Sequence, residues 1–277
     1  MRIIAELCQN HKGDIDTLEE MVREAAKFAD IVKIQTIWAD TLTHREEYEE
    51  YRPFEKEYLR LKELELSEET ELNFINLCKE LGVEPMTSLF SKQQFDRFNR
   101  LGYRKLKLSG YVLPAFNYGE DLTGLNFDEL IFSTSSLTLE EIEKTILNLE
   151  KLNIKFTMLQ CTCIYPTPAE KLNLYNINFY KKYFDLSEIG FSDHTNPYID
   201  NLFPTKQAIF EGAQTIERHF TIFNPEKTRD GKVSINVDMG LELKRFGELP
   251  KKQQYFELNK FNEKEVFNHE YYRGRFK

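Results

Sequence analysis

The chain has 277 residues, of which 41% are hydrophobic and 30% are charged, and its formal net charge is −9. This composition is typical of a globular protein, and the length suits a single α/β barrel. The negative charge argues against nucleic acid or an anionic membrane as a main partner, because both bind basic surfaces. No segment approaches the ~18 apolar residues that a membrane-spanning helix needs.

Eight short apolar or β-branched runs alternate with longer amphipathic segments. The runs predict strands at residues 2–7, 31–35, 83–88, 105–109, 130–134, 155–161, 188–192 and 215–217. Helical spacing of apolar residues predicts helices over 15–28, 67–81 and 138–152, and shorter ones over 93–101, 178–184, 200–211 and 241–246. Ser67 and Thr138, each followed by acidic residues, are N-cap signals for the helices they open.

This alternation predicts the α/β class and a closed (β/α)₈ TIM barrel. An open doubly wound sheet is the alternative, but residues 6–13 lack the G-x-G-x-x-G phosphate turn that such sheets usually carry. We expect one barrel domain over residues 1–250 and a C-terminal tail over 251–277 that packs on or near it. Residues 38–64 form a long charged insertion, either a lid or a surface excursion.

Cysteine use predicts a reducing compartment. The four cysteines form no C-x-x-C pair and are too few for a secreted disulfide scaffold: Cys8, Cys78, Cys161 and Cys163. The apolar run that begins at Ile3 is stopped by Glu6, so we expect no signal peptide. We therefore expect free thiols and a cytoplasmic protein.

Polar residues occur at or just after the carboxyl ends of the predicted strands, which meet at one mouth of a parallel barrel. They include Glu6, Lys33, Gln35, Ser88, Lys107, Ser133, Ser192 and Glu217. Two lysines with several hydroxyls suit a phosphate or a phospho-carboxylate, and acids beside them can transfer protons or hold sugar hydroxyls. Singly, such lysines often extend to solvent and such hydroxyls often cap helices. Their coincidence at eight strand ends favours a functional site.

His194 and His219 follow the last two predicted strands, about one βα unit apart. Two imidazoles converging beside acidic side chains suit a divalent metal that polarises an oxygen. The alternative is a pair of histidines whose hydrogen bonds are satisfied within the core or rim. The polar surroundings favour the metal site.

Several motifs, in order along nearly the whole chain, resemble those of the sialic acid synthase family. They are Ile4-Ala5-Glu6 with Asn10-His11-Lys12-Gly13, Val32-Lys33-Ile34-Gln35, Cys161-Thr162 with Ile164-Tyr165-Pro166-Thr167-Pro168, Gly190-Phe191-Ser192-Asp193-His194-Thr195, and Ile216-Glu217-Arg218-His219-Phe220-Thr221. Shorter matches are Phe132-Ser133-Thr134 and Asp230 with Ser234. Members of the family make nine-carbon 2-keto sugar acids.

The resemblance implies a metal-dependent barrel that condenses phosphoenolpyruvate with an open-chain N-acyl amino sugar. His194 and His219 would hold the metal, with Mn²⁺ expected and Mg²⁺ or Co²⁺ as alternatives. Phosphoenolpyruvate would be held by Lys33, Ser88, Lys107, Ser133 and Ser192. Glu6 and Gln35 would lie near the reacting carbons, and the sugar would contact Tyr165, Glu217 and Asp230.

The chain departs from the family pattern in several places. Cys163 stands where the family usually has serine or asparagine, the register of Ser109 after Lys107 differs, and Thr228-Arg229 replaces the usual residues before Asp230. Many relatives carry a C-terminal antifreeze-like domain that lends an arginine to the partner subunit's sugar site. We expect a homodimer, and we expect either that a separate protein or the tail, residues 271–277, supplies that contact, or that the substrate differs.

Two rival functions remain. One is a 3-deoxy-octulosonate 8-phosphate synthase-like condensation with a sugar phosphate, which needs a second basic cluster for which Lys227, Arg229 and Lys232 are the candidates. The other is a catalytically inactive barrel that serves as an assembly subunit, and the intact His194 and Glu217 argue against it.

Overall fold

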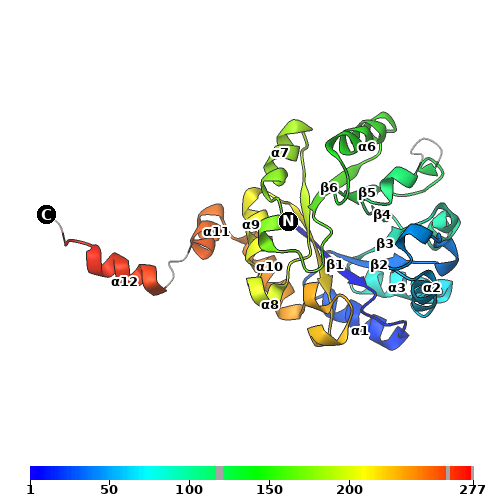
Figure 1. Cartoon of the computed structure of the whole chain (residues 1–277), viewed down its shortest axis with the longest axis horizontal. Coiled ribbons are helices and arrows are strands. Elements are labelled where there is room, and N and C mark those ends of the chain that lie inside the picture. Colours follow the sequence, from blue (N-terminus) through cyan, green and yellow to red (C-terminus); the bar gives the residue numbers. More distant parts are fainter. Residues whose placement is uncertain (117–120, 260–262, 276–277) are drawn as a thin grey trace.

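The computed structural model describes residues 1–116, 121–259 and 263–275. Its strands form one closed parallel sheet surrounded by helices (Figure 1). The strands are β1 (Arg2–Cys8), β2 (Ile31–Thr36), β3 (Glu84–Leu89), β4 (Lys105–Leu108), β5 (Glu129–Ser133), β6 (Phe156–Cys161), β7 (Gly190–Asp193), β8 (Thr215–Phe220) and β9 (Ser234–Ile235). They pair in chain order, β8 closes the barrel on β1, and β9 adds a short parallel strand to β8. The predicted (β/α)₈ barrel is confirmed.

Most of the helices cover the outer face of the sheet. The helices are α1 (Ile15–Ala25), α2 (Phe54–Lys62), α3 (Glu68–Glu80), α4 (Phe95–Leu101), α6 (Leu139–Lys151), α7 (Tyr175–Tyr183), α8 (Pro197–Asp200), α9 (Phe203–Glu211), α10 (Val237–Glu248), α11 (Lys251–Leu258) and α12 (Glu263–Tyr272). Both predicted N-caps are confirmed: the Ser67 hydroxyl accepts from Thr70 N, and Thr138 forms a reciprocal capping box with Glu141. All helices of the described part of the chain are too short or too polar to cross a membrane.

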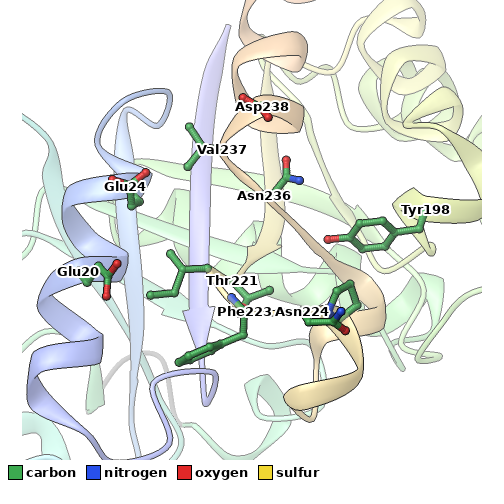
Figure 2. Close-up of a pocket in the computed structure, with 11 residues that line it drawn as sticks. Glu20, Glu24, Tyr198, Thr221, Phe223, Asn224, Asn236, Val237 and Asp238 are labelled. Atoms are coloured by element: carbon green, nitrogen blue, oxygen red, sulfur yellow. Dashed lines mark hydrogen bonds between the residues drawn. The ribbon is translucent and has the colours of Figure 1, made fainter.

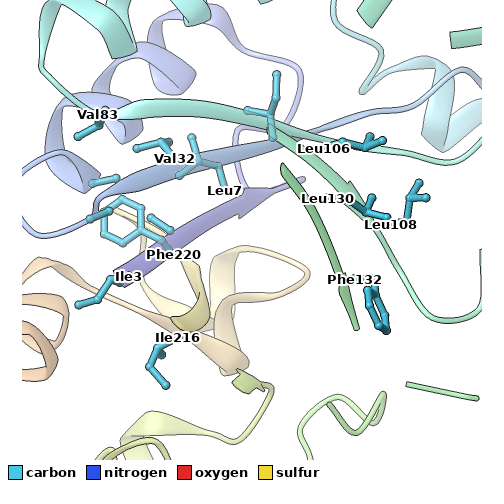
Figure 3. Close-up of a cluster of buried hydrophobic side chains, with 14 of the residues drawn as sticks. Ile3, Leu7, Val32, Val83, Leu106, Leu108, Leu130, Phe132, Ile216 and Phe220 are labelled. Atoms are coloured by element: carbon cyan, nitrogen blue, oxygen red, sulfur yellow. The ribbon is translucent and has the colours of Figure 1, made fainter. Parts of the chain in front are cut away.

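Alternation along the strands divides the barrel into an outer and an inner layer. On β1, Ile3 and Leu7 belong to the large cluster of buried apolar side chains between the sheet and the helices, part of which is shown in Figure 3. Ile4 belongs to a separate small cluster with one residue from each of four other strands: Ile31, Met86, Ile131 and Leu159. Glu6 follows Ile4 with a period of two, so its side chain lies inside the barrel on the carboxyl side of this apolar layer.

An ion-pair network lies at the amino ends of the strands. Arg2 Nη1 and Lys105 Nζ are each 2.8 Å from Glu129 Oε2, and Thr157 Oγ1 donates to Glu129 Oε1 at 2.6 Å. The Glu129 carboxylate is fully buried. The polar residues at this end therefore stabilise the barrel floor, and the chemistry-bearing residues gather at the opposite end.

The structure departs from the expected elements mainly at two places. The charged insertion contains helix α2, which periodicity missed because only Leu61 of that helix is buried. The tail contains α11 and α12. Lys251 Nζ, at the start of α11, donates to the carbonyl oxygen of Ile209 in α9 at 3.2 Å, whereas α12 extends away from the barrel in Figure 1. The division into domains at residue 250 remains a prediction.

Candidate active site at the carboxyl end of the barrel

Four charged side chains from β1, β2, β4 and β8 meet inside the barrel mouth. Lys107 Nζ lies 2.9 Å from Glu217 Oε1 and 3.1 Å from Oε2. Lys33 Nζ is ion-paired with Glu6 and lies 3.7 Å from Glu217 Oε2. All four side chains are buried, so two cations and two anions face each other almost without water. We call these residues the lysine–glutamate cluster.

Hydroxyl groups extend this cluster. Ser88 Oγ accepts from Lys33 Nζ at 2.9 Å, and Ser192 Oγ donates to Glu217 Oε1 at 2.8 Å. Ser133 Oγ is also buried but accepts from the Gly110 amide at 3.1 Å. Lys33 and Ser88 are thus in direct contact, Lys107 and Ser192 are joined through Glu217, and Ser133 is tied to the neighbouring loop.

Burial and the charge balance shift the pKa values of the cluster. Burial, together with the nearby Lys107 ammonium, lowers the pKa of Lys33 to about 7, against the opposing pull of Glu217. Burial alone would raise the pKa of Glu217, but the ammonium groups of Lys107 and Lys33 outweigh it and hold that pKa below its ordinary range. An arriving anion would favour the ammonium form of Lys33, so anion binding and protonation are linked at this position.

The two predicted histidines lie side by side at the mouth. Their ring centroids are 5.2 Å apart, and the Tyr165 ring packs on both, at 4.3 Å from His194 and 5.7 Å from His219. The Tyr165 hydroxyl lies 3.0 Å from His194 Nε2. Burial lowers the pKa of His194 to about 4 and that of His219 to about 3. Both imidazoles are therefore neutral near pH 7, the form that binds metals.

His219 belongs to a group of side chains that could hold a metal ion. Donor atoms of Cys8, His219 and Asp230 all lie within 4.8 Å of one another. Cys8 Sγ donates to Asp230 Oδ2 at 2.9 Å, and His219 Nδ1 is buried without a hydrogen-bond partner among the described residues. His194 is outside this group, and its Nε2 faces the Tyr165 hydroxyl. An orphaned, buried nitrogen beside a carboxylate and a thiol is the donor set that a divalent cation would complete.

Sequence reasoning missed Cys8. Cys8 ends β1 two residues after Glu6, but a register shift between these residues and a φ of +49° at Cys8 interrupt the strand alternation, so its approach to Asp230 depends on tertiary packing. Burial and the Asp230 carboxylate raise the pKa of Cys8 well above its ordinary value, which keeps the sulfur protonated when no cation is bound. Gln35, which was predicted, accepts a long hydrogen bond of 3.5 Å from Gln9 Nε2 at the rim.

A separate hollow of about 500 Å³ lies outside the mouth, between α1, α8 and the start of α10 (Figure 2). Its lining includes Glu20, Glu24, Tyr198, Phe223 and Asp238. It shares no residue with the lysine–glutamate cluster, so it is distinct from the site at the mouth.

A closed parallel barrel with buried ionisable groups at its carboxyl mouth is the architecture of TIM-barrel proteins whose functional site lies at the strand ends. The model of the NeuB family matches residues 21–248, and the chain belongs to this family. The N,N'-diacetyllegionaminic acid synthase of Legionella pneumophila is 34% identical over 232 residues, which cover 79% of this chain and 64% of that protein. The pseudaminic acid synthase of Campylobacter jejuni is 28% identical over 244 residues, covering 85% and 69%.

Solved structures agree on the fold. The N-acetylneuraminic acid synthetase of Leptospira borgpetersenii superposes with a TM-score of 0.77 at 23% identity, covering 99% of this chain and 91% of that one. This likeness concerns the fold alone. The chain spans about two thirds of the length of the two curated relatives named above, 64% and 69%.

Proposed function

We propose that the protein condenses phosphoenolpyruvate with an N-acyl amino sugar to give a nonulosonic 2-keto acid and inorganic phosphate. The observation that carries this proposal is the lysine–glutamate cluster directly beside the histidines and the Cys8, His219 and Asp230 donor group. The cluster suits an anionic substrate, and the donor group suits a cation at a carbonyl oxygen. Membership of the NeuB family and the names of the relatives, which make such acids, support it.

Lys33 and Lys107 bind the phosphate and carboxylate of phosphoenolpyruvate in this proposal. Charge-assisted hydrogen bonds to a buried anion are strong, and the Ser88 and Ser192 hydroxyls lie where they can add neutral donors. Ser133 is proposed as a further donor from β5. Until the anion arrives, Glu217 pairs with Lys107 and Glu6 pairs with Lys33, so each buried lysine has a carboxylate partner in the free protein.

The reaction forms a carbon–carbon bond and a bond from carbon 2 to the oxygen of water, and it breaks the bond from carbon 2 to the phosphate oxygen. Carbon 3 of phosphoenolpyruvate attacks the aldehyde carbon, whose oxygen takes up a proton and becomes a hydroxyl. Water adds to carbon 2, and loss of phosphate from the resulting tetrahedral centre leaves the ketone. Glu6 is the carboxylate proposed to accept the water's proton, because the Cys8 amide, at 2.6 Å from Oε1, fixes its orientation. Gln35 is proposed to lie near the reacting carbons.

A divalent metal fits the donor atoms present. His219 and Asp230 would hold it with Cys8, and His194 would join if its ring turned from the Tyr165 hydroxyl. When bound, the metal would polarise the aldehyde oxygen as a Lewis acid. Nitrogen and carboxylate donors suit Mn²⁺ or Co²⁺, whereas Mg²⁺ prefers an all-oxygen shell.

Tyr165, Glu217 and Asp230 are proposed to contact the acceptor sugar. The rival condensation with a sugar phosphate gains little from the basic residues first considered, because Lys232 Nζ lies 3.5 Å from Glu226 and Arg229 Nη1 lies 3.8 Å from Glu57. A homodimer and a separate antifreeze-like domain protein remain proposals for the partners.

The decisive assay follows phosphate release and 2-keto acid formation with phosphoenolpyruvate, a panel of N-acyl amino sugars, and Mn²⁺ or Co²⁺. We expect release to require all three, to disappear with chelator, and to disappear in Lys107→Met. Lys232→Ala, at an exposed lysine outside the cluster, is the matched control and should remain active. Phosphate release that does not depend on the sugar would refute the proposal.

A further inference from the structure

Helix α2 of the charged insertion is joined to the β1 and β2 side of the barrel mouth. Arg60 Nη1 donates to the side-chain oxygen of Gln9, which follows β1. Gln9 Nε2 in turn donates to Gln35 Oε1 at the end of β2, at 3.5 Å. A line of side-chain hydrogen bonds therefore runs from α2 to a residue proposed to lie near the reacting carbons.

Glu57 of α2 connects this line to the opposite flank of the mouth. Its carboxylate accepts from Arg60 Nε at 3.0 Å and from Arg60 Nη2 at 2.5 Å, and it lies 3.8 Å from Arg229 Nη1 in the loop after β8. Arg229 directly precedes Asp230, a member of the metal-donor group. Arg60 is the main cause that lowers the pKa of Glu57, against the effect of burial, so the carboxylate is ionised at neutral pH. The single carboxylate of Glu57 is thus joined to both flanks of the barrel mouth.

Other contacts fix the insertion in the same place. Tyr58 and Lys62 of α2 both reach the Asp40 carboxylate, each at 2.8 Å. Gly13, with a φ of +77°, follows β1 and approaches the end of α2 so closely that a Cβ there would collide with the carbonyl oxygen of Glu63. These contacts therefore anchor the insertion at the mouth, although most of its residues are exposed.

We propose that Glu57 is a positioning residue that fixes the insertion as one wall of the acceptor-sugar subsite. The inference rests on the proposed function, because it assigns the lysine–glutamate cluster to phosphoenolpyruvate. Glu57 contacts Arg229 directly and is linked to Gln35 through Arg60 and Gln9, so its contacts reach both flanks of the donor group where the aldehyde would lie. The wall offers guanidinium and amide N–H donors from Arg60, Arg229 and Gln9, which suit the carbonyl and hydroxyl oxygens of an N-acyl sugar.

The test compares Glu57→Ala, Glu57→Gln and Glu57→Asp with Glu47→Gln. Glu47 is the matched control, because it forms an ion pair within the same insertion, with Arg45 Nε donating at 2.9 Å. KM and kcat are measured for each substrate in turn. Hydrogen exchange over residues 46–62 is measured in the free proteins, which reports the position of the insertion without any need for turnover.

In Glu57→Ala and Glu57→Gln we expect the acceptor KM to rise about tenfold, equivalent to ~1.4 kcal/mol, with the phosphoenolpyruvate KM unchanged. Exchange in α2 should be faster in both, Glu57→Asp should recover part of the affinity, and Glu47→Gln should match the wild type. Equal changes in both KM values, or a fall in kcat alone, would overturn the inference. If the wild type condenses nothing, the proposed function fails, and unaltered exchange in Glu57→Ala would separately refute the positioning role.

Discussion

Glu217→Gln probes how the mouth holds two buried lysines. In the wild type the carboxylate accepts from Lys107 at 2.9 and 3.1 Å and from Ser192 at 2.8 Å, and it faces Lys33 at 3.7 Å. An amide removes the negative charge and turns an N–H₂ group toward the ammonium groups. Removing one partner of a buried ion pair costs about 3–5 kcal/mol, because the remaining charge stays buried and uncompensated.

For a chain of this size, that cost corresponds to a fall in melting temperature on the order of 10 °C. Phosphoenolpyruvate should reverse much of it, because its anionic groups replace the missing charge and a ligand stabilises the state that binds it. The assay is thermal unfolding of wild type and Glu217→Gln, each with and without saturating phosphoenolpyruvate. The melting temperatures of the two proteins could differ only slightly, or by the same amount with and without phosphoenolpyruvate. Either result would show that the lysines do not form the anion site.

Three further predictions test separate parts of the structure. Lys33→Ala and Lys107→Ala should raise the phosphoenolpyruvate KM far more than the acceptor KM, since each charge-assisted bond is worth ~1.5–3 kcal/mol; an effect confined to the acceptor would contradict this. His219→Ala should abolish Mn²⁺ binding in calorimetry while the fold survives, and His194→Ala should weaken Mn²⁺ binding less. Undiminished Mn²⁺ binding in His219→Ala would exclude the donor group found here. Despite burial, Arg2, Lys105 and Thr157 lower the pKa of Glu129 from 4.5 to about 2. The contribution of the Glu129 carboxylate to the free energy of unfolding is therefore complete above pH 4.5 and is lost as the pH falls toward 2. Urea unfolding of the wild type should show this free energy falling by about 3 kcal/mol across that range, and Glu129→Gln should not show this fall. If the free energies of unfolding of wild type and Glu129→Gln change in parallel with pH, this prediction is refuted.

The barrel was predictable because its strands are short apolar runs separated by helices with strong caps. Ser67 and Thr138 mark helix starts by local chemistry that tertiary packing did not override. The meeting of Lys33, Lys107 and Glu217 was also within reach, because parallel strands carry their carboxyl ends to one mouth.

Other features depend on packing that periodicity does not encode. Helix α2 is largely exposed and is held by ion pairs, including Glu57 with Arg60, so its sequence resembles a solvated loop. The pairing of Cys8 with Asp230 joins residues 222 positions apart, and no local sequence pattern predicts it. The contacts of Glu217 with Lys107 and Ser192 likewise depend on the three-dimensional register of β4, β7 and β8, and the expectation that Glu217 contacts the sugar remains a prediction.

The most direct measurement of the central claim is carbon NMR of the reaction with phosphoenolpyruvate labelled at carbon 3. With metal and a suitable N-acyl amino sugar, we predict that the labelled carbon becomes a methylene group bonded to the former aldehyde carbon, with one phosphate released per product. Labelled pyruvate as the sole product, or unchanged phosphoenolpyruvate across the acceptor panel, would contradict the account.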